Sequence, residues 1–353
     1  IVRKICRRHN INMEIKDLLE KIQSTNVENS KLYFVTRLLK EGISKRAKMI
    51  DKYIFKAYQI DIDDEIRKYL YDCSNEELER VIKKEYQMID YDVISDDTEH
   101  LFTYKINNKA LPFQDIVRNK LSSNPPKAQS IAGIVSDDED LWAYCIGFND
   151  VENSDWIYTF RKIQPSKVAV DEKDNDKSLL GMKTIRTLFS TTSQKLELLK
   201  GETVNLDKQI DCVFYDDTFY IIKKGNFEQI VGLQEEFKEQ ATSVVSEMKQ
   251  SQMFEGLEKI DEEIDKNPSI HKKLVRIAKI GSYREITPQV IKKMEKVCKK
   301  YGSKLNIKNG KLAIEEKEDI EVLLKMLADY YKTGDVTGKS YGTFAGKEMK
   351  INE

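Results

Sequence analysis

Residues 211–230, with the sequence DCVFYDDTFYIIKKGNFEQI, constrain the fold more than any other stretch of this chain. Two short apolar runs, Cys212 to Tyr215 and Phe219 to Ile222, are rich in aromatic and β-branched residues. Two aspartates and a threonine separate the runs, and aspartate is a common turn residue. The pattern predicts a β-hairpin.

A helix is predicted directly after this hairpin. Gly225 breaks the second strand, and Asn226 is a suitable N-cap for a helix that begins at Phe227. The spacing of apolar residues therefore changes here, from strand-like before the stretch to helical after it.

Strand-like segments dominate the residues that precede the hairpin. Residues 141–148 and 156–163 contain both tryptophans and are separated by a polar segment, so they are predicted to form another hairpin. Pro125 and Pro126 exclude regular structure and indicate a linker. In the N-terminal third, helices are predicted at 14–23, 61–71 and 75–86, and strands at 32–38, 53–60 and 101–106.

Helices dominate after residue 225. Thr287 followed by Pro288 is a strong helix start, because proline is preorganised for the first helical position. Asn309-Gly310 lies between two alternating arms and predicts a type I′ turn. Helices are predicted at 226–250, 254–265, 269–280, from 288 onward and at 317–331, and the tail from Lys332 is expected to be loosely held.

These patterns predict an α+β protein: a mixed N-terminal and central β-rich domain followed by a mostly helical C-terminal domain with a small β-hairpin. The chain has 353 residues, which is enough for two domains. We expect an N-terminal α/β region at 1–127, of which 1–12 are an upstream extension, and a β-rich region at 128–225 that packs with it. The helical domain is expected at 226–353, with its hairpin at 304–315.

Charge is distributed unevenly along the chain. The net charge is −1, but residues 51–99 hold fifteen Asp and Glu against seven Lys and Arg, and residues 271–311 hold thirteen Lys and Arg against two Glu. Cations gathered on one surface attract phosphate and give salt-sensitive, sequence-independent binding to nucleic acid. The alternative is that these lysines are ordinary solvated helix surface.

Two groups of basic residues are therefore candidate DNA contacts. The first belongs to the predicted helices of the basic segment. The second lies beside aromatic residues at a predicted strand end, where exposed cations with no ligand are the alternative. The candidates are Lys272, Lys273, Arg276, Lys279, Arg284, Lys292, Lys293, Lys296, Lys299 and Lys300 in the first group, and Arg161, Lys162 and Lys167 in the second.

Motifs for catalysis or cofactor binding are not apparent. The three histidines are isolated and no cysteine pair has the spacing of metal ligands, so neither a metal nor a cofactor is expected. Metal-dependent nucleases hold a metal with carboxylates beside a lysine, and Asp211 and Lys223 mimic part of this arrangement. Ile221 stands where the second carboxylate is needed, so the two aspartates between the apolar runs are expected to serve the turn.

The composition is typical of a cytoplasmic protein. No apolar run approaches the roughly 20 residues of a membrane span, and the N-terminal residues lack the apolar core of a signal peptide. The five cysteines are scattered, which indicates reduced thiols rather than a disulfide framework.

Several stretches resemble the KwaB-like proteins of the bacterial Kiwa anti-phage defence system. Residues 159–167, TFRKIQPSK, are similar to a strand end of that family, and residues 210–228 to its central hairpin and helix start. Residues 329–347, which include DYY and TGKSY, are similar to its C-terminal end. The N-terminal third departs from the pattern.

The resemblance implies a cytoplasmic bacterial defence protein that binds DNA, interferes with incoming phage and partners a KwaA-like integral membrane protein. It supplies no catalytic residue. We expect a homo-oligomer that its partner recruits to the inner face of the cell membrane. The leading hypothesis is an effector that binds duplex DNA without sequence preference. The alternatives are a metal-dependent nuclease with an unrecognised site, and a non-catalytic scaffold that docks on a membrane protein through the acidic segment 51–99.

Overall fold

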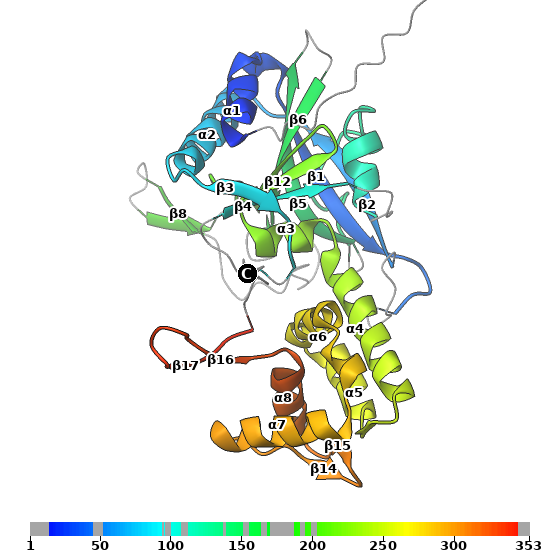
Figure 1. The fold of residues 1–353 in the computed structure, drawn as a ribbon. Helices are drawn as coiled ribbons and strands as arrows, with labels where there is room; N and C mark the ends of the chain where they lie inside the picture. The colour runs from blue at the N-terminus through cyan, green and yellow to red at the C-terminus, as the bar shows by residue number, and fades with distance from the viewer. Residues whose placement is uncertain are drawn as a thin grey trace, which may run out of the picture. The chain divides into compact units, whose positions relative to one another are not determined.

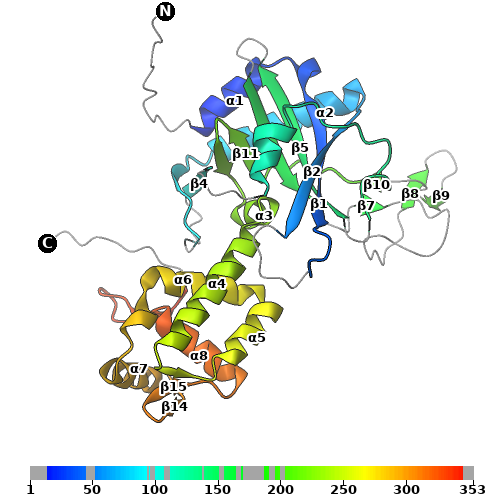
Figure 2. The same ribbon diagram turned by 90° about the vertical axis from the view of Figure 1, so that its right-hand side faces the viewer.

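The computed structural model describes residues 14–44, 52–93, 95, 100–106, 112–136, 139–150, 155–163, 168–169, 187–190, 195–198 and 203–344. The chain divides into two compact units, which Figures 1 and 2 show from two directions. Where they are described, the first unit comprises residues 1–38, 54–90 and 99–231, and the second comprises residues 39–53, 91–98 and 232–353.

An eight-stranded mixed sheet forms the centre of the first unit (Figure 1). Its strand order is β2-β1-β5-β6-β11-β12-β4-β3. β3 and β4 are parallel, whereas the pairs β1/β5, β5/β6, β6/β11, β11/β12 and β12/β4 are antiparallel. The bounds are β1 Lys31–Leu39, β2 Tyr53–Ile60, β3 Gln87–Asp90, β4 His100–Lys105, β5 Glu139–Asp150, β6 Asp155–Lys162, β11 Cys212–Tyr215 and β12 Thr218–Ile221.

Two amphipathic helices, α1 (Ile15–Ser24) and α2 (Asp64–Ile82), pack on one face of this sheet. Leu18 of α1 and Leu78 of α2 are fully buried in a cluster with Val213 of β11. Successive strand residues point to opposite faces, so every second residue of the central strands meets these helices. Burial of this apolar surface is the main force that holds the layers together.

Aromatic side chains cover the opposite face. Phe113 precedes a short π-helical turn, η2 (Ile116–Lys120), and its ring lies 5.5 Å from that of Phe160 on β6. Phe227 of α3 (Lys224–Ile230) lies 5.3 Å from Phe219 on β12. The smaller elements of this unit are η1 (Val27–Asn29), the pair β7 (Val168–Ala169) and β10 (Thr203–Val204), and the pair β8 (Thr187–Ser190) and β9 (Lys195–Leu198).

The second unit is mostly helical and has its own core. Ala241, Leu274 and Leu327 are fully buried in one apolar cluster that draws on α4, α6 and α8. A three-stranded sheet of order β13-β15-β14 and a two-stranded pair, β16 and β17, complete it. The bounds are α4 Leu233–Gln250, β13 Phe254–Glu255, α5 Glu258–Lys266, α6 Pro268–Ile280, η4 Ser282–Glu285, α7 Pro288–Lys300, β14 Ile307–Lys308, β15 Lys311–Ala313, α8 Lys317–Leu327, β16 Tyr331–Thr333 and β17 Ser340–Gly342.

The predicted α+β class is confirmed, with a large mixed sheet before the helices and a small hairpin among them. The hairpin of residues 211–230 is also confirmed: Asp216 and Asp217 both have positive φ, as a tight turn between two strands requires. Asn309 and Gly310 form the second predicted turn, again with positive φ at both positions. Thr287 caps α7 as predicted, because its hydroxyl accepts a hydrogen bond from the Val290 amide.

The prediction of one helix over 226–250 was wrong in two respects. The helix begins at Lys224 and not at Phe227, and Asn226 is no N-cap because its side chain donates to Asp211 instead. A turn at Gly232, with φ of 82°, then separates α3 from α4. Only a residue that tolerates the left-handed region permits this break at little cost.

Two further boundaries were also predicted wrongly, and one hairpin was not predicted. Residues 64–82 form one unbroken helix, in which the Ser74 hydroxyl donates to the Leu70 carbonyl one turn earlier and does not compete with the helix at that point. Phe254 and Glu255 pair in parallel with β15 and do not belong to a helix. The tail from Lys332, for which no regular structure was predicted, contains most of the β16–β17 hairpin.

Candidate nucleic-acid interface

Helix α7 presents one buried side and one basic side. Ile291, Met294 and Cys298 are buried in the core of the second unit. At about 100° per residue, the lysines of this helix fall within an arc of about 120° on the opposite side. All of them are exposed, and we call them the α7 lysine face: Lys292, Lys293, Lys296, Lys299 and Lys300.

The acidic residues that the structure describes leave most of the α7 lysine face without an ion-pair partner. Lys299 pairs with Glu295 one turn earlier, with an Nζ–Oε1 distance of 2.9 Å. Within the part of the chain that the structure describes, no ion pair involves Lys292, Lys293 or Lys296. Lys300 has its Nζ 5.1 Å from the centre of the Tyr301 ring. The face therefore keeps most of its positive charge for an external ligand.

The candidates on and near α6 have a different role, because each of three cations is held by the protein itself. Arg276 is buried and its Nε donates to the carbonyl of Ala328 at 3.3 Å. Lys279 pairs with Asp92 at 3.0 Å, and Arg284 pairs with Glu247 at 2.9 Å. Lys272 and Lys273 are half-buried. The Nζ of Lys272 lies over the Phe237 ring, and the Nζ of Lys273 lies over the Phe344 ring.

The second group of candidates lies in the interior of the first unit. Arg161 is 9% exposed and forms two parallel hydrogen bonds to Asp207, at 2.8 and 2.9 Å. Lys162 is 6% exposed; its Nζ donates to the carbonyl of Ile163 and lies 3.7 Å from the Trp142 ring centre. A DNA backbone has no access to these two side chains, so they are not part of the proposed contact surface. Lys167 lies outside the described residues.

Burial changes the protonation of Lys162. Removal from water, with a smaller contribution from the positive charge of Arg37, lowers the pKa of Lys162 to about 7. The contact with the Trp142 ring is that of a cation over an aromatic face. This residue is therefore a structural group whose charge changes near neutral pH.

Asp211, the residue that suggested a nuclease, is a hydrogen-bond hub. It is completely buried and accepts bonds from Arg161 Nη1 at 2.6 Å, the Lys162 amide at 2.7 Å and Asn226 Nδ2 at 2.8 Å. Its carboxylate thus joins β6 to the start of α3. Among the residues that the structure describes, no three His, Cys, Asp or Glu side chains are grouped as metal ligands would be.

A cluster of tyrosines at the end of α7 was not anticipated from the sequence. Tyr301 stacks on Tyr331 of β16, with ring centres 4.4 Å apart and an interplanar angle of 10°. The Tyr301 hydroxyl lies 3.2 Å from Ser340 Oγ of β17 and donates to it in the neutral form. Because the Ser340 hydroxyl can donate to the ionised phenolate, it is the main cause that lowers the pKa of Tyr301. The only sequence signal was the Tyr330-Tyr331 pair before a glycine-rich segment, which does not reveal a partner thirty residues earlier.

The fold and this face together define a two-unit α+β protein whose helical unit carries a basic surface. A family model described as Kiwa protein KwaB-like matches residues 138–337, which include parts of both units. The chain therefore belongs to the KwaB-like family, and it is associated with Kiwa anti-phage defence. No curated protein and no solved structure shows significant similarity to it. No helix within the described ranges has both the length and the hydrophobicity to cross a bilayer.

Proposed function

We propose that the α7 lysine face binds duplex DNA without sequence preference, and that the chain serves as a DNA-binding effector in anti-phage defence. The observation that carries this proposal is the placement of five exposed lysines on the side of α7 opposite its buried residues. Membership of the KwaB-like family supplies the biological setting.

The geometry of the face suits a DNA backbone. Lys292, Lys296 and Lys300 follow one another at intervals of about 6 Å along the helix, since four residues advance by that length. Duplex DNA carries about one negative charge per 1.7 Å of its axis, so a row of cations always finds phosphates within reach. Lysine acts as a mobile point charge and does not read bases in a fixed fork. Binding that ignores the base sequence follows from these properties.

The salt dependence of binding gives a quantitative test. If the four lysines other than Lys299 each neutralise a phosphate, the slope of log affinity against log salt is about −3.6, and fourfold more salt weakens binding by about a hundredfold. The double variant Lys292→Ala with Lys296→Ala should have a slope of about −1.8 and lose only about tenfold over the same range. Fluorescence anisotropy of a labelled duplex at several salt concentrations measures both slopes.

The matched control removes two exposed lysines elsewhere in the same unit. Lys266 and Lys317 pair with Glu262 and Glu263, and Lys266→Ala with Lys317→Ala changes the net charge equally. The proposal requires that this control keep the slope of the unaltered protein. Equal slopes for all three proteins would show that α7 is not the contact. Labelled fragments that appear when magnesium is added would indicate a nuclease, and no retention at any salt concentration would favour a scaffold.

We further propose that the protein acts in the cytoplasm beside a KwaA-like integral membrane protein and forms a homo-oligomer. The support for the partner is the family, which belongs to the Kiwa system. Co-expression of the tagged chain with a KwaA-like protein, followed by membrane isolation, tests the partnership. Recovery of the chain in the membrane fraction only when the partner is present is the expected result, and recovery that ignores the partner would contradict it.

A further inference from the structure

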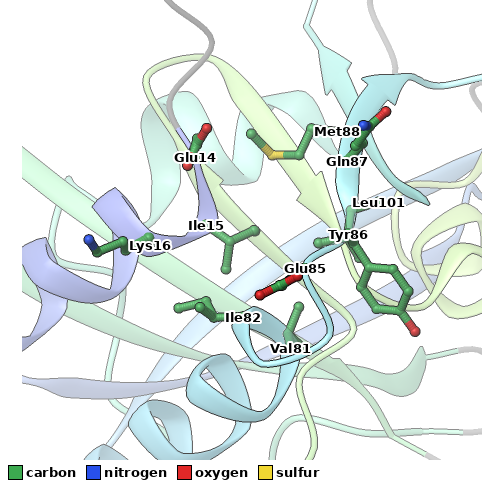
Figure 3. A pocket seen from close by; sticks show the side chains of 10 residues that line it. All are labelled: Glu14, Ile15, Lys16, Val81, Ile82, Glu85, Tyr86, Gln87, Met88 and Leu101. Atoms are coloured by element: carbon green, nitrogen blue, oxygen red, sulfur yellow. The ribbon is translucent and has the colours of Figure 1, made fainter. Parts of the chain in front are cut away.

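A pocket of about 630 Å³ lies in the first unit, between the start of α1, the end of α2 and the strands β3 and β4 (Figure 3). Its floor is apolar: Ile15, Val81 and Leu101 are buried there. Met88 of β3 reaches over this floor from the opposite side (Figure 3). The pocket therefore has an apolar surface large enough to hold a long side chain.

Two carboxylates border this apolar floor. Glu85 points into the space between Ile15 and Val81 (Figure 3), and Glu14, directly before α1, also lines the pocket. The one cation of the lining, Lys16, extends away from Glu85 and lies 3.7 Å from Glu20. Within the described ranges, Glu85 forms no ion pair. The pocket thus combines apolar surface with the negative charge of Glu85, which no cation of the described residues neutralises.

The pocket lies directly at an open sheet edge. β3 is the last strand of the eight-stranded sheet, and among the described residues no strand pairs with its outer side. Gln87 and Met88 belong both to this strand and to the pocket lining. An edge strand exposes unpaired backbone N–H and C=O groups, which are a template for a further strand.

We propose that β3 binds an extended, basic segment of a protein partner, which adds a strand to the sheet and places one arginine or lysine side chain in the pocket. The aliphatic stem of that side chain lies on Ile15, Val81 and Leu101, as long basic residues commonly cover apolar surface. Its charged head meets Glu85 and Glu14. The backbone of the segment pairs with β3, so affinity comes from the main chain and selectivity from the pocket.

The charge of the pocket selects this occupant over others. Phosphate of a nucleic acid or a lipid would be repelled by Glu14 and Glu85, so this site is separate from the α7 lysine face and does not depend on DNA binding. A second copy of the chain would bring β3 and the same carboxylates against themselves, since a two-fold interface joins identical patches. A basic segment from a different protein is attracted by Glu14 and Glu85 and brings no second copy of these carboxylates to the interface.

The test uses a fluorescein-labelled peptide of alternating valine and arginine, with an otherwise identical peptide of valine and glutamate. The arginine peptide should bind the full-length protein, and the glutamate peptide should not. Glu85→Gln keeps the shape of the side chain and should weaken binding about tenfold, because it removes the charge that the arginine head meets. Glu76→Gln, at an exposed position of α2 outside the pocket, should leave binding unchanged.

Hydrogen exchange locates the peptide independently of its affinity. Amides of residues 87–90 should exchange more slowly in the presence of the arginine peptide, because their outer groups gain partners. Equal binding by the unaltered protein and Glu85→Gln would overturn the proposal, as would protection confined to other segments. Self-association that Met88→Lys abolishes would assign this edge to a second copy and would also overturn it.

Discussion

Replacing Lys162 by methionine tests whether a buried amine weakens the first unit at neutral pH. Lys162 is 6% exposed, and burial lowers its pKa from the usual 10.5 to about 7. Methionine fills a similar volume without a charge. The substitution removes the cost of burying the ammonium and loses one hydrogen bond to the carbonyl of Ile163.

The magnitude follows from the pKa shift. The difference between pKa values of 10.5 and about 7 corresponds to a cost of at most about 5 kcal/mol for keeping the buried ammonium charged, at about 1.4 kcal/mol per pH unit. Loss of the hydrogen bond costs the variant about 1 kcal/mol. Relaxation of the protein around the buried charge lowers the gain further. We therefore expect Lys162→Met to raise the free energy of unfolding by about 2 kcal/mol at pH 7.

The pH dependence has a definite sign. The unfolded chain holds the Lys162 proton up to about pH 10.5, whereas the folded chain releases it above about pH 7. Between these values the unfolded state binds more protons, so the contribution of Lys162 to stability rises with pH. The excess in free energy of unfolding of Lys162→Met over the unaltered protein should therefore be largest below about pH 7. It should fall by about 2 kcal/mol between pH 7 and pH 9.

Urea unfolding at several pH values measures this difference. Both tryptophans, Trp142 and Trp156, lie in the first unit, so their fluorescence follows the unfolding of that unit. Lys68→Met, at a side chain that is 70% exposed, is the control and should show little pH-dependent difference. A difference in unfolding free energy between Lys162→Met and the unaltered protein that stays constant from pH 7 to pH 9 would show that folded Lys162 keeps its proton over this range.

Two other substitutions test features of the fold. Asp211→Ala should lower the free energy of unfolding by about 3–5 kcal/mol, because it strips a buried partner from Arg161; a loss below about 1 kcal/mol in urea unfolding would show that the hub contributes little. Gly256→Ala should cost more than about 2 kcal/mol, since an added Cβ would lie 2.1 Å from the carbonyl oxygen of Ile314 and φ is 76°. Gly310→Ala, which also has positive φ but open space around it, should cost only about 1 kcal/mol, and equal thermal shifts for the two variants would contradict this contrast.

Local signals in the sequence predicted local structure well. The turn residues between β11 and β12, the Asn309-Gly310 pair and the Thr287-Pro288 start each determine backbone geometry within a few residues. Wrong predictions arose where a distant partner decides the outcome. Asn226 caps nothing because Asp211 is within its reach, and Phe254 is a strand residue only because β15 lies beside it.

The same distinction applies to the candidate site. The lysines of α7 could be assigned to one solvent side from their spacing alone, because helical periodicity is a local property. The burial of Arg161 and Lys162 could not be predicted in this way, because it depends on the order of eight strands in the sheet. The spacing also could not show that Arg284 forms an ion pair with Glu247, a residue on another helix.

The arrangement of α7 has an evolutionary consequence. Its lysines are exposed and carry the charge of the helix, whereas the uncharged Ile291, Met294 and Cys298 are buried in the core. A relative can gain or lose a lysine here by a single substitution without disturbing the interior. The proposed affinity for a polyanion can therefore change in small increments, under selection that is independent of folding.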